Sequence, residues 1–252
     1  METKKIEEVT IKILESKEKL GTASAVFVAE KINAAISEKG KARIIIATGA
    51  SQFEFLDHLR TENIDWSKVT VFHLDEYHKM SDQHPASFRK YLKERILAEV
   101  NPAKVYYLEG DAQDIDGVMQ QYETLLKEDE IDIACIGIGE NGHLAFNDPP
   151  VADFNDKKWV KLVELDEGCR QQQLGEGWFA SFDEVPTHAL SLTIPAILNS
   201  NVISCVVPDE RKANAVKCSL YGEISEKCPG SALRTHKNTV IWLDNGAASK
   251  LN

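Results

Sequence analysis

The chain has 252 residues, of which 43% are hydrophobic and 27% are charged, and its formal net charge is −11. This length and composition suit a single globular domain with a sizeable core. The negative charge argues against nucleic acid or an anionic membrane as a partner. A small phosphorylated ligand is not excluded, because a few backbone N–H groups and one lysine can bind an anion inside an acidic protein.

Short apolar runs alternate with amphipathic segments along the whole chain. The spacing of Ile and Val near the N-terminus predicts a helix over 9–38. Strands are then predicted at 42–47, 69–74, 104–108, 131–138, 189–192, 202–207 and 239–243. Helices are predicted between them at 52–60, 87–97, 115–128, 194–199 and 211–221. This alternation predicts one α/β domain over 1–252, with an open, mostly parallel, Rossmann-like sheet and helices on both faces.

Cysteine usage and the N-terminal segment bear on the compartment. The five cysteines are odd in number, widely spread and without CxxC spacing, so neither a disulfide framework nor a zinc site is predicted. The N-terminal residues lack the apolar stretch of a signal peptide, and no apolar run approaches the roughly 20 residues that span a bilayer. We therefore expect a cytoplasmic protein with free thiols, no bound metal and no membrane partner.

One long segment, 149–186, has no predicted strand and carries glycines among polar residues. Segments of this length inside a compact domain are usually functional lids, or they contain helix that the sequence pattern does not show. We treat 149–186 as a candidate lid.

The first polar cluster is Thr48-Gly49-Ala50-Ser51, between an apolar strand and an amphipathic helix. Small residues allow the backbone to approach a phosphate, and free N–H groups at a helix start favour an anion. A strand-to-helix turn capped by Ser51 is the alternative interpretation, because the cluster is neither a Walker A loop nor a GxGxxG fingerprint.

The second cluster is Asp75-Glu76-Tyr77, delivered by the apolar strand before it. Neighbouring side chains of an extended chain point to opposite sides, so we expect only one of the two carboxylates to face a crevice. A carboxylate that is partly buried gains proton affinity and can act as a general base. A solvated acidic turn is the alternative.

The third cluster surrounds His143, which follows glycines at 137, 139 and 142 just past a strand end. Histidine exchanges protons near neutral pH, and a carboxylate such as Asp148, five residues on, can orient its ring. A structural histidine beside a glycine-rich turn would explain the residue by itself. In an open α/β sheet these strand-end clusters converge on one crevice.

Taken together, the motifs resemble those of the glucosamine-6-phosphate deaminase family in order and spacing. The resemblance is carried by Thr48–Ser51, by the Phe-His-Leu-Asp75-Glu76-Tyr77 string, by His84-Pro85-Ala-Ser87-Phe88, by 139–149, and by stretches at 185–190 and 209–213. It therefore extends over nearly the whole chain.

The resemblance implies a role for particular residues. Asp75 would abstract the sugar C2 proton and His143 would open the ring, with Asp148 and Asn141 in support. The phosphate would be held by Thr48, Gly49, Ala50, Ser51 and Lys212, with Glu76, Gly142 and Arg170 as further substrate contacts. Many family members have Asp and Glu where this chain has Asn141 and Asp148, and the arginine-rich stretch of the family is reduced here to Arg170.

The implied reaction converts glucosamine 6-phosphate and water into fructose 6-phosphate and ammonia, in amino sugar catabolism, without a cofactor. The resemblance thus implies an isomerase and, because water is consumed, a hydrolase. Three alternatives are carried forward: another amino sugar phosphate such as galactosamine 6-phosphate, a 6-phosphogluconolactonase, or a non-catalytic sugar-phosphate sensor. The lactonase family continues its Gly-His string differently from Leu144-Ala-Phe146. Family members differ in assembly, so a homo-oligomer is among the expected states.

Overall fold

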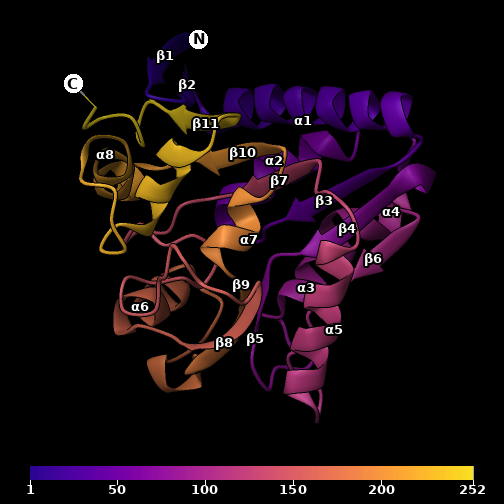
Figure 1. Cartoon of the computed structure of the whole chain (residues 1–252). Coiled ribbons are helices and arrows are strands. Elements are labelled where there is room, and N and C mark those ends of the chain that lie inside the picture. The colour runs from indigo at the N-terminus through magenta and orange to yellow at the C-terminus, as the bar shows by residue number, and fades with distance from the viewer. Residues whose placement is uncertain (252) are drawn as a thin grey trace.

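An eight-stranded sheet runs through the centre of the computed structural model, which describes residues 1–251 (Figure 1). Its strands are β1 (Glu2–Ile6), β2 (Val9–Leu14), β3 (Ala42–Ile46), β4 (Val69–His73), β6 (Lys104–Tyr106), β7 (Ile133–Ile136), β10 (Val202–Val207) and β11 (Thr239–Asp244). Their order is β1-β2-β11-β10-β7-β3-β4-β6. Every neighbouring pair is parallel except β1 and β2. The predicted open, mostly parallel sheet is confirmed.

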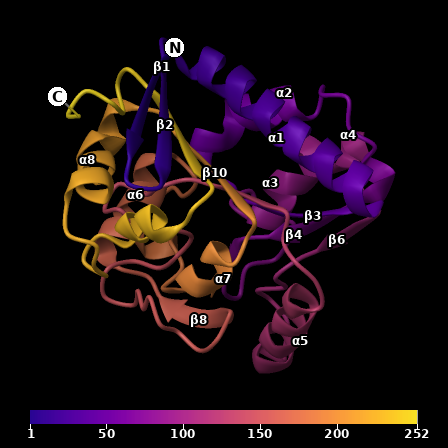
Figure 2. The ribbon, with the colours of Figure 1, turned by 45° about the horizontal axis from the view of Figure 1, so that its top comes forward.

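Helices cover both faces of this sheet, as predicted (Figure 2). They are α1 (Lys17–Lys39), α2 (Phe53–Leu59), α3 (Phe88–Leu92), α4 (Ala98–Val100), α5 (Ile115–Lys127), α6 (Glu167–Gly175), α7 (Ile194–Leu198) and α8 (Ala213–Tyr221). Successive strand residues point to opposite faces. Ile44 and Ile46 of β3 accordingly pack in one core with α1, α2 and α3, whereas Ile45 packs in the other core with α5, α7 and α8.

The longest helix, α1, shows how local sequence sets the boundaries. Ser16 caps its start, where the hydroxyl accepts a hydrogen bond from the Lys19 N–H, and Gly40 ends it with a φ of 75°. The buried residues between them pack on β3 and its neighbours. No helix in residues 1–251 is both long and apolar enough to cross a membrane.

A second, three-stranded antiparallel sheet lies below the main sheet in the view of Figure 1. The sequence did not predict this sheet as a separate unit. It consists of β5 (Asp75–Tyr77), β9 (His188–Leu192) and β8 (Val160–Glu164), in that order. Tyr77, Phe88, Phe146 and Phe179 form part of its own small core. This sheet fixes Asp75 in an extended conformation opposite Ser191.

Several sequence predictions need correction. The predicted helix over 9–38 is wrong in its first eight residues, because Val9, Ile11 and Ile13 alternate into the core as strand β2 and α1 begins only at Lys17. The segment 149–186 contains β8 and α6. The predicted strand at 189–192 exists but belongs to the small sheet. Part of the predicted helix over 87–97 is a π-helix, Lys93–Leu97.

Candidate active site

An open pocket lies where the carboxyl ends of β3, β4, β7 and β10 meet, which are four adjacent strands of the main sheet. The segments that follow these strands contribute Gly49, Asp75, His143 and Lys212 to its lining. Helix α6 covers it with Gln172 and Gln173. Open α/β sheets place their ligand crevices at this edge, and the three predicted polar clusters do converge here.

Small residues of the loop after β3 form one end of the pocket. Thr48, Gly49 and Ser51 line it, and Ala50 lies in a smaller adjoining hollow that shares Ser51 with the pocket. Gly49 has a φ of 98°, a conformation that other residues rarely adopt. The Tyr91 hydroxyl donates a hydrogen bond to the Gly49 carbonyl at 2.9 Å, which holds the loop in place.

The Lys212 side chain reaches the same end of the pocket although it is only 4% exposed. Burial lowers the pKa of this ammonium, and the negative charges of Glu176 and Glu140 oppose that change. Among residues 1–251 no carboxylate forms an ion pair with it. A buried ammonium without a partner favours binding of an anion, so we call this region, lined by Thr48, Gly49, Ser51 and Lys212, the anion end.

Asp75 lines the pocket, with 7% of its surface exposed. Burial, and then the negative charge of Glu76, raise the pKa of Asp75 to about 8. A carboxyl with such a pKa can accept and return a proton near neutral pH.

Glu76 points the other way and does not line the pocket. Its carboxylate accepts hydrogen bonds from the N–H groups of Tyr77, Phe88 and Arg89, from the Ser87 hydroxyl, and from the Arg89 guanidinium. Burial raises the pKa of Glu76, and these hydrogen bonds oppose the rise. The structure therefore gives Glu76 a structural position, not the substrate contact that the resemblance implied.

The His143 ring packs directly on the backbone of the glycine-rich loop. A Cβ atom at Gly139 would lie 2.2 Å from the imidazole, so only glycine allows this approach. Gly142 has a φ of 91° and redirects the chain toward His143, but its own atoms do not line the pocket. Glycine at these two positions thus sets the orientation of the histidine.

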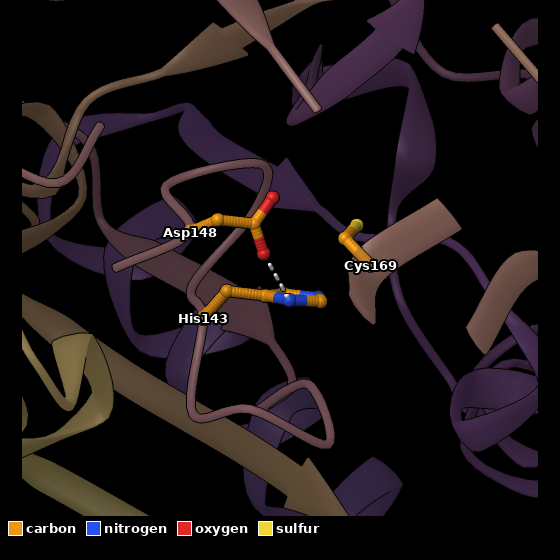
Figure 3. A group of neighbouring side chains, drawn as sticks. All are labelled: His143, Asp148 and Cys169. Carbon is orange, nitrogen blue, oxygen red and sulfur yellow. Dashed lines mark ion pairs between the residues drawn. The ribbon is translucent and has the colours of Figure 1, made fainter. Parts of the chain in front are cut away.

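Asp148 is fully buried, and its Oδ1 lies 2.8 Å from His143 Nδ1 (Figure 3). Burial acts to raise the pKa of Asp148, but hydrogen bonding with His143 and Asn141 more than offsets this and lowers the pKa. A charged Asp148 fixes the imidazole tautomer and leaves Nε2 for exchange with a ligand.

Asn141 holds this pair together from outside the pocket. Its amide N–H₂ donates to Asp148 at 2.8 Å and to Asp166 at 3.0 Å, while its carbonyl accepts the His143 N–H at 3.0 Å. An aspartate could not donate to two carboxylates. Because Asp166 caps the start of α6, Asn141 also connects the histidine loop to the candidate lid.

A cluster of His143, Asp148 and Cys169 could supply three metal ligands, since one ligand atom of each lies within 4.8 Å of the others. Figure 3 shows Cys169 approaching the ion pair from a different element. Burial and the Asp148 charge raise the pKa of the Cys169 thiol well above its usual value. His143 Nδ1 and Asp148 Oδ1 are already paired with each other at 2.8 Å, so a metal ion at this cluster would have to replace that ion pair.

Arg170 lies outside the pocket. Its guanidinium donates hydrogen bonds to the carbonyls of Phe182 and Val185 at 3.0 and 2.8 Å, and it stacks on the Phe182 ring. The substrate contact that the resemblance implied for Arg170 is therefore not found, because the side chain binds the C-terminal part of the 149–186 segment.

Sequence reasoning missed three polar side chains of the pocket, Gln172, Gln173 and Glu176, all in or just after α6. Gln173 accepts a hydrogen bond from the buried Tyr77 hydroxyl at 2.7 Å. The spacing of buried Cys169 and Gln173, with Asp166 as a helix cap, is the signal that predicts one face of a helix.

Proteins that are similar in sequence and structure align with this chain over most of its length. A glucosamine-6-phosphate deaminase of Bacillus cytotoxicus is 33% identical over 96% of this chain and 88% of its own length. One from Clostridium acetobutylicum is 35% identical over 89% of this chain and 94% of its own length. A solved structure described as a monomeric glucosamine-6-phosphate deaminase has a TM-score of 0.87 at 31% identity, covering 95% of this chain and 99% of its own.

These relatives correct one expectation. The expected classification as a hydrolase is wrong. The relatives at 31–35% identity are named deaminases, which indicates a deaminating isomerase. A 6-phosphogluconolactonase of Shewanella baltica matches with a TM-score of 0.76, but its 18% identity over 93% of this chain and 96% of its own shows a shared fold only.

The match is not restricted to single motifs. The model of the family described as glucosamine-6-phosphate isomerases/6-phosphogluconolactonase matches residues 15–242, which include every pocket residue discussed above. The chain belongs to this family.

Proposed function

We propose that this chain converts glucosamine 6-phosphate into fructose 6-phosphate and ammonia by deaminating isomerisation. One observation supports this most strongly: Asp75, whose carboxyl pKa is about 8, lines the same pocket as the His143–Asp148 pair and the buried Lys212. The pocket thus combines two proton-transfer groups with an anion end. Relatives named for this reaction align over most of the chain.

His143 would first open the sugar ring. The imidazole takes the anomeric hydroxyl proton and delivers a proton to the ring oxygen, so the hemiacetal becomes an aldehyde without net loss of a proton. Asp148 stabilises the charged imidazole, and Asn141 holds both residues through three hydrogen bonds.

Asp75 would then isomerise the open chain. Its carboxylate removes the proton from C2 and returns one at C1, which converts the 2-amino aldehyde into a 2-imino alcohol. Water adds to the imine carbon, and ammonia leaves to give the ketose. Ring opening and isomerisation move only protons between positioned groups, and water then replaces ammonia at the imine carbon, so the proposal involves neither a metal nor an organic cofactor.

The phosphate would occupy the anion end. Thr48 and Ser51 offer hydroxyl groups, the Gly49–Ala50 backbone permits close approach, and Lys212 provides the charge. Binding there would place the sugar carbons toward Asp75 and His143.

Ammonia release from purified protein tests the proposal. Glucosamine 6-phosphate is supplied with EDTA, and galactosamine 6-phosphate and 6-phosphogluconolactone are run alongside. Release from the first substrate with chelator present supports the proposal. If no ammonia is released from glucosamine 6-phosphate, the proposal is contradicted. Turnover of galactosamine 6-phosphate or of 6-phosphogluconolactone would then identify one of the other two enzymes, whereas stabilisation by ligand without any turnover would indicate a sensor.

The Asp75→Asn variant tests the assigned base. Removal of a general base typically costs 10²–10⁴-fold in rate, so we expect kcat to fall by at least about a hundredfold. The matched control is Asp116→Asn on the exposed start of α5, which should keep normal turnover. Near-normal kcat in Asp75→Asn would disprove the assignment.

Three finer expectations belong to the proposal. The five cysteines are all free, which supports a reducing compartment such as the cytoplasm. Movement of 149–186 as a lid is supported by the α6 residues that reach into the pocket. Assembly into a homo-oligomer stays a prediction; the solved relative is described as monomeric.

A further inference from the structure

Glu176 places a carboxylate beside the anion end of the pocket. It directly follows α6 and lines both the pocket and the adjoining hollow, and Ser51 and Lys212 also line both. Its negative charge acts on the Lys212 ammonium. None of the catalytic steps described above uses it.

Hydrogen bonds fix this carboxylate at both oxygens. Gln172 Nε2 donates to Glu176 Oε1 at 2.8 Å, and Trp178 Nε1 donates to Oε2 at 3.1 Å. Gln172 is itself held by the Glu140 N–H, which donates to its Oε1 at 2.9 Å. The position of Glu176 is therefore built into the structure.

Aromatic packing around Trp178 also stabilises the position of Glu176. The Trp178 ring contacts Phe53 and Tyr91 edge-on, with centroids 6.4 and 6.2 Å apart. Tyr91 in turn holds the Gly49 carbonyl. One aromatic cluster thus positions both the glycine loop and the indole that binds Glu176.

The charges at this end nearly cancel. Lys212 is the one lysine or arginine among the pocket-lining residues that the structure describes. Nearby Arg211 is paired with Asp209 at 3.2 Å and with Glu140 at 3.7 Å. Lys17 also lines the adjoining hollow, and it is paired with Asp209 at 3.0 Å. A ligand anion is therefore attracted by the one ammonium in this region that has no ion pair among residues 1–251, Lys212, and is repelled by Glu176, and the repulsion grows in proportion to the charge of the ligand.

We propose that Glu176 is a specificity-determining residue that disfavours doubly charged groups at the anion end. A phosphate dianion therefore binds there more weakly than it would without Glu176, and the binding advantage of a dianion over a singly charged ester is reduced. This inference rests on the proposed function and refines its substrate class.

The Glu176→Gln variant, compared on glucosamine 6-phosphate and glucosamine 6-sulfate, tests the inference. Because the repulsion scales with ligand charge, KM should fall about tenfold for the phosphate dianion and about threefold for the sulfate monoanion. The kcat values should change less than about twofold, since the substitution acts on binding and not on proton transfer.

Matched variants separate charge from packing. Glu167→Gln removes an exposed carboxylate at the start of α6 and should leave both KM values unchanged. Glu176→Ala should lower KM in the same direction as Glu176→Gln, which keeps the test decisive if one variant folds poorly. Equal KM changes for the two esters, or none, would overturn the inference.

Binding measurements distinguish this inference from the proposed reaction. Thermal shifts are recorded with each ester for the wild-type chain and for Glu176→Gln. If no ammonia is released but the phosphate shift increases more than the sulfate shift in the variant, the reaction assignment fails and the role of Glu176 stands. If neither ester stabilises either protein, the inference is overturned as well.

Discussion

Asp75 and Glu76 are neighbours in sequence, yet the structure gives them opposite tasks. Strand β5 points Asp75 into the pocket and Glu76 into a set of hydrogen-bond donors. The side-chain alternation of an extended segment predicts this division. The alternation does not predict the energetic cost to the fold. Asp75 is buried beside the Glu76 carboxylate, and among residues 1–251 no lysine or arginine forms an ion pair with it.

A pH-dependent gain in stability is therefore expected for Asp75→Asn. The Asp75 pKa is about 8 in the folded chain against an ordinary 3.8, so between these values the folded state keeps a proton that the unfolded state has lost. The free energy of unfolding consequently decreases as pH rises through this window. Asparagine stays neutral, so the variant should match wild type near pH 4, and its advantage should grow by about 1.4 kcal/mol per pH unit to about 5 kcal/mol at pH 8.

Urea unfolding at a series of pH values checks this expectation. The exposed Asp116→Asn variant should differ from wild type by a similar small amount at every pH. A difference between Asp75→Asn and wild type that shrinks as pH rises would show that Asp75 is charged in the folded protein.

At the scale of elements, the Glu76 carboxylate joins β5 to the start of α3. Its acceptors are filled entirely by donors from Tyr77, Ser87, Phe88 and Arg89. This connection holds the segment between β5 and α3 against the small sheet, and with it Asp75, the first residue of β5.

Glu76→Gln should therefore destabilise the protein although it conserves shape. The amide N–H₂ would face existing donors, and Arg89, 6% exposed, would lose a charged partner. Breaking a buried ion pair on one side typically costs about 3–5 kcal/mol. We expect a loss of about 3 kcal/mol in urea unfolding. Glu94→Gln on the neighbouring π-helix, where the side chain is exposed, is the control; equal effects would contradict this account.

Prediction from the sequence succeeded where long apolar strands led into polar clusters. The strand ends before Thr48, Asp75 and His143 were found because β3, β4 and β7 are buried on both faces and read as continuous apolar runs. Strand β2 was missed, because its buried Val9, Ile11 and Ile13 were assigned to a helical spacing.

The candidate lid was the least predictable part of the site. Glycines at both ends of α6 and three consecutive glutamines weaken its helix signal. Its residues are positioned by tertiary contacts, such as Asn141 to Asp166 and Tyr77 to Gln173, which local sequence does not encode. The same limitation concealed Glu176.

At the scale of the whole molecule, the anion end combines residues that are far apart in sequence, from Gly49 after β3 to Lys212 after β10. An anion held there would bridge strands on both sides of β7, the strand between them in the sheet. Since those contacts exist only in the folded chain, binding must raise the free energy of global unfolding.

Lys212→Met should reveal this coupling by two opposite changes. Without ligand the variant should melt at a higher temperature than wild type, because a buried ammonium whose pKa is lowered by burial is replaced by an apolar side chain. With glucosamine 6-phosphate at 100 times Kd, wild type should gain about 2.7 kcal/mol and the variant almost nothing. The exposed Lys217→Met on α8 should keep the wild-type response. A variant that keeps the ligand shift would show that the anion binds elsewhere, whereas a variant that melts lower without ligand would show that Lys212 has an internal partner in the folded chain.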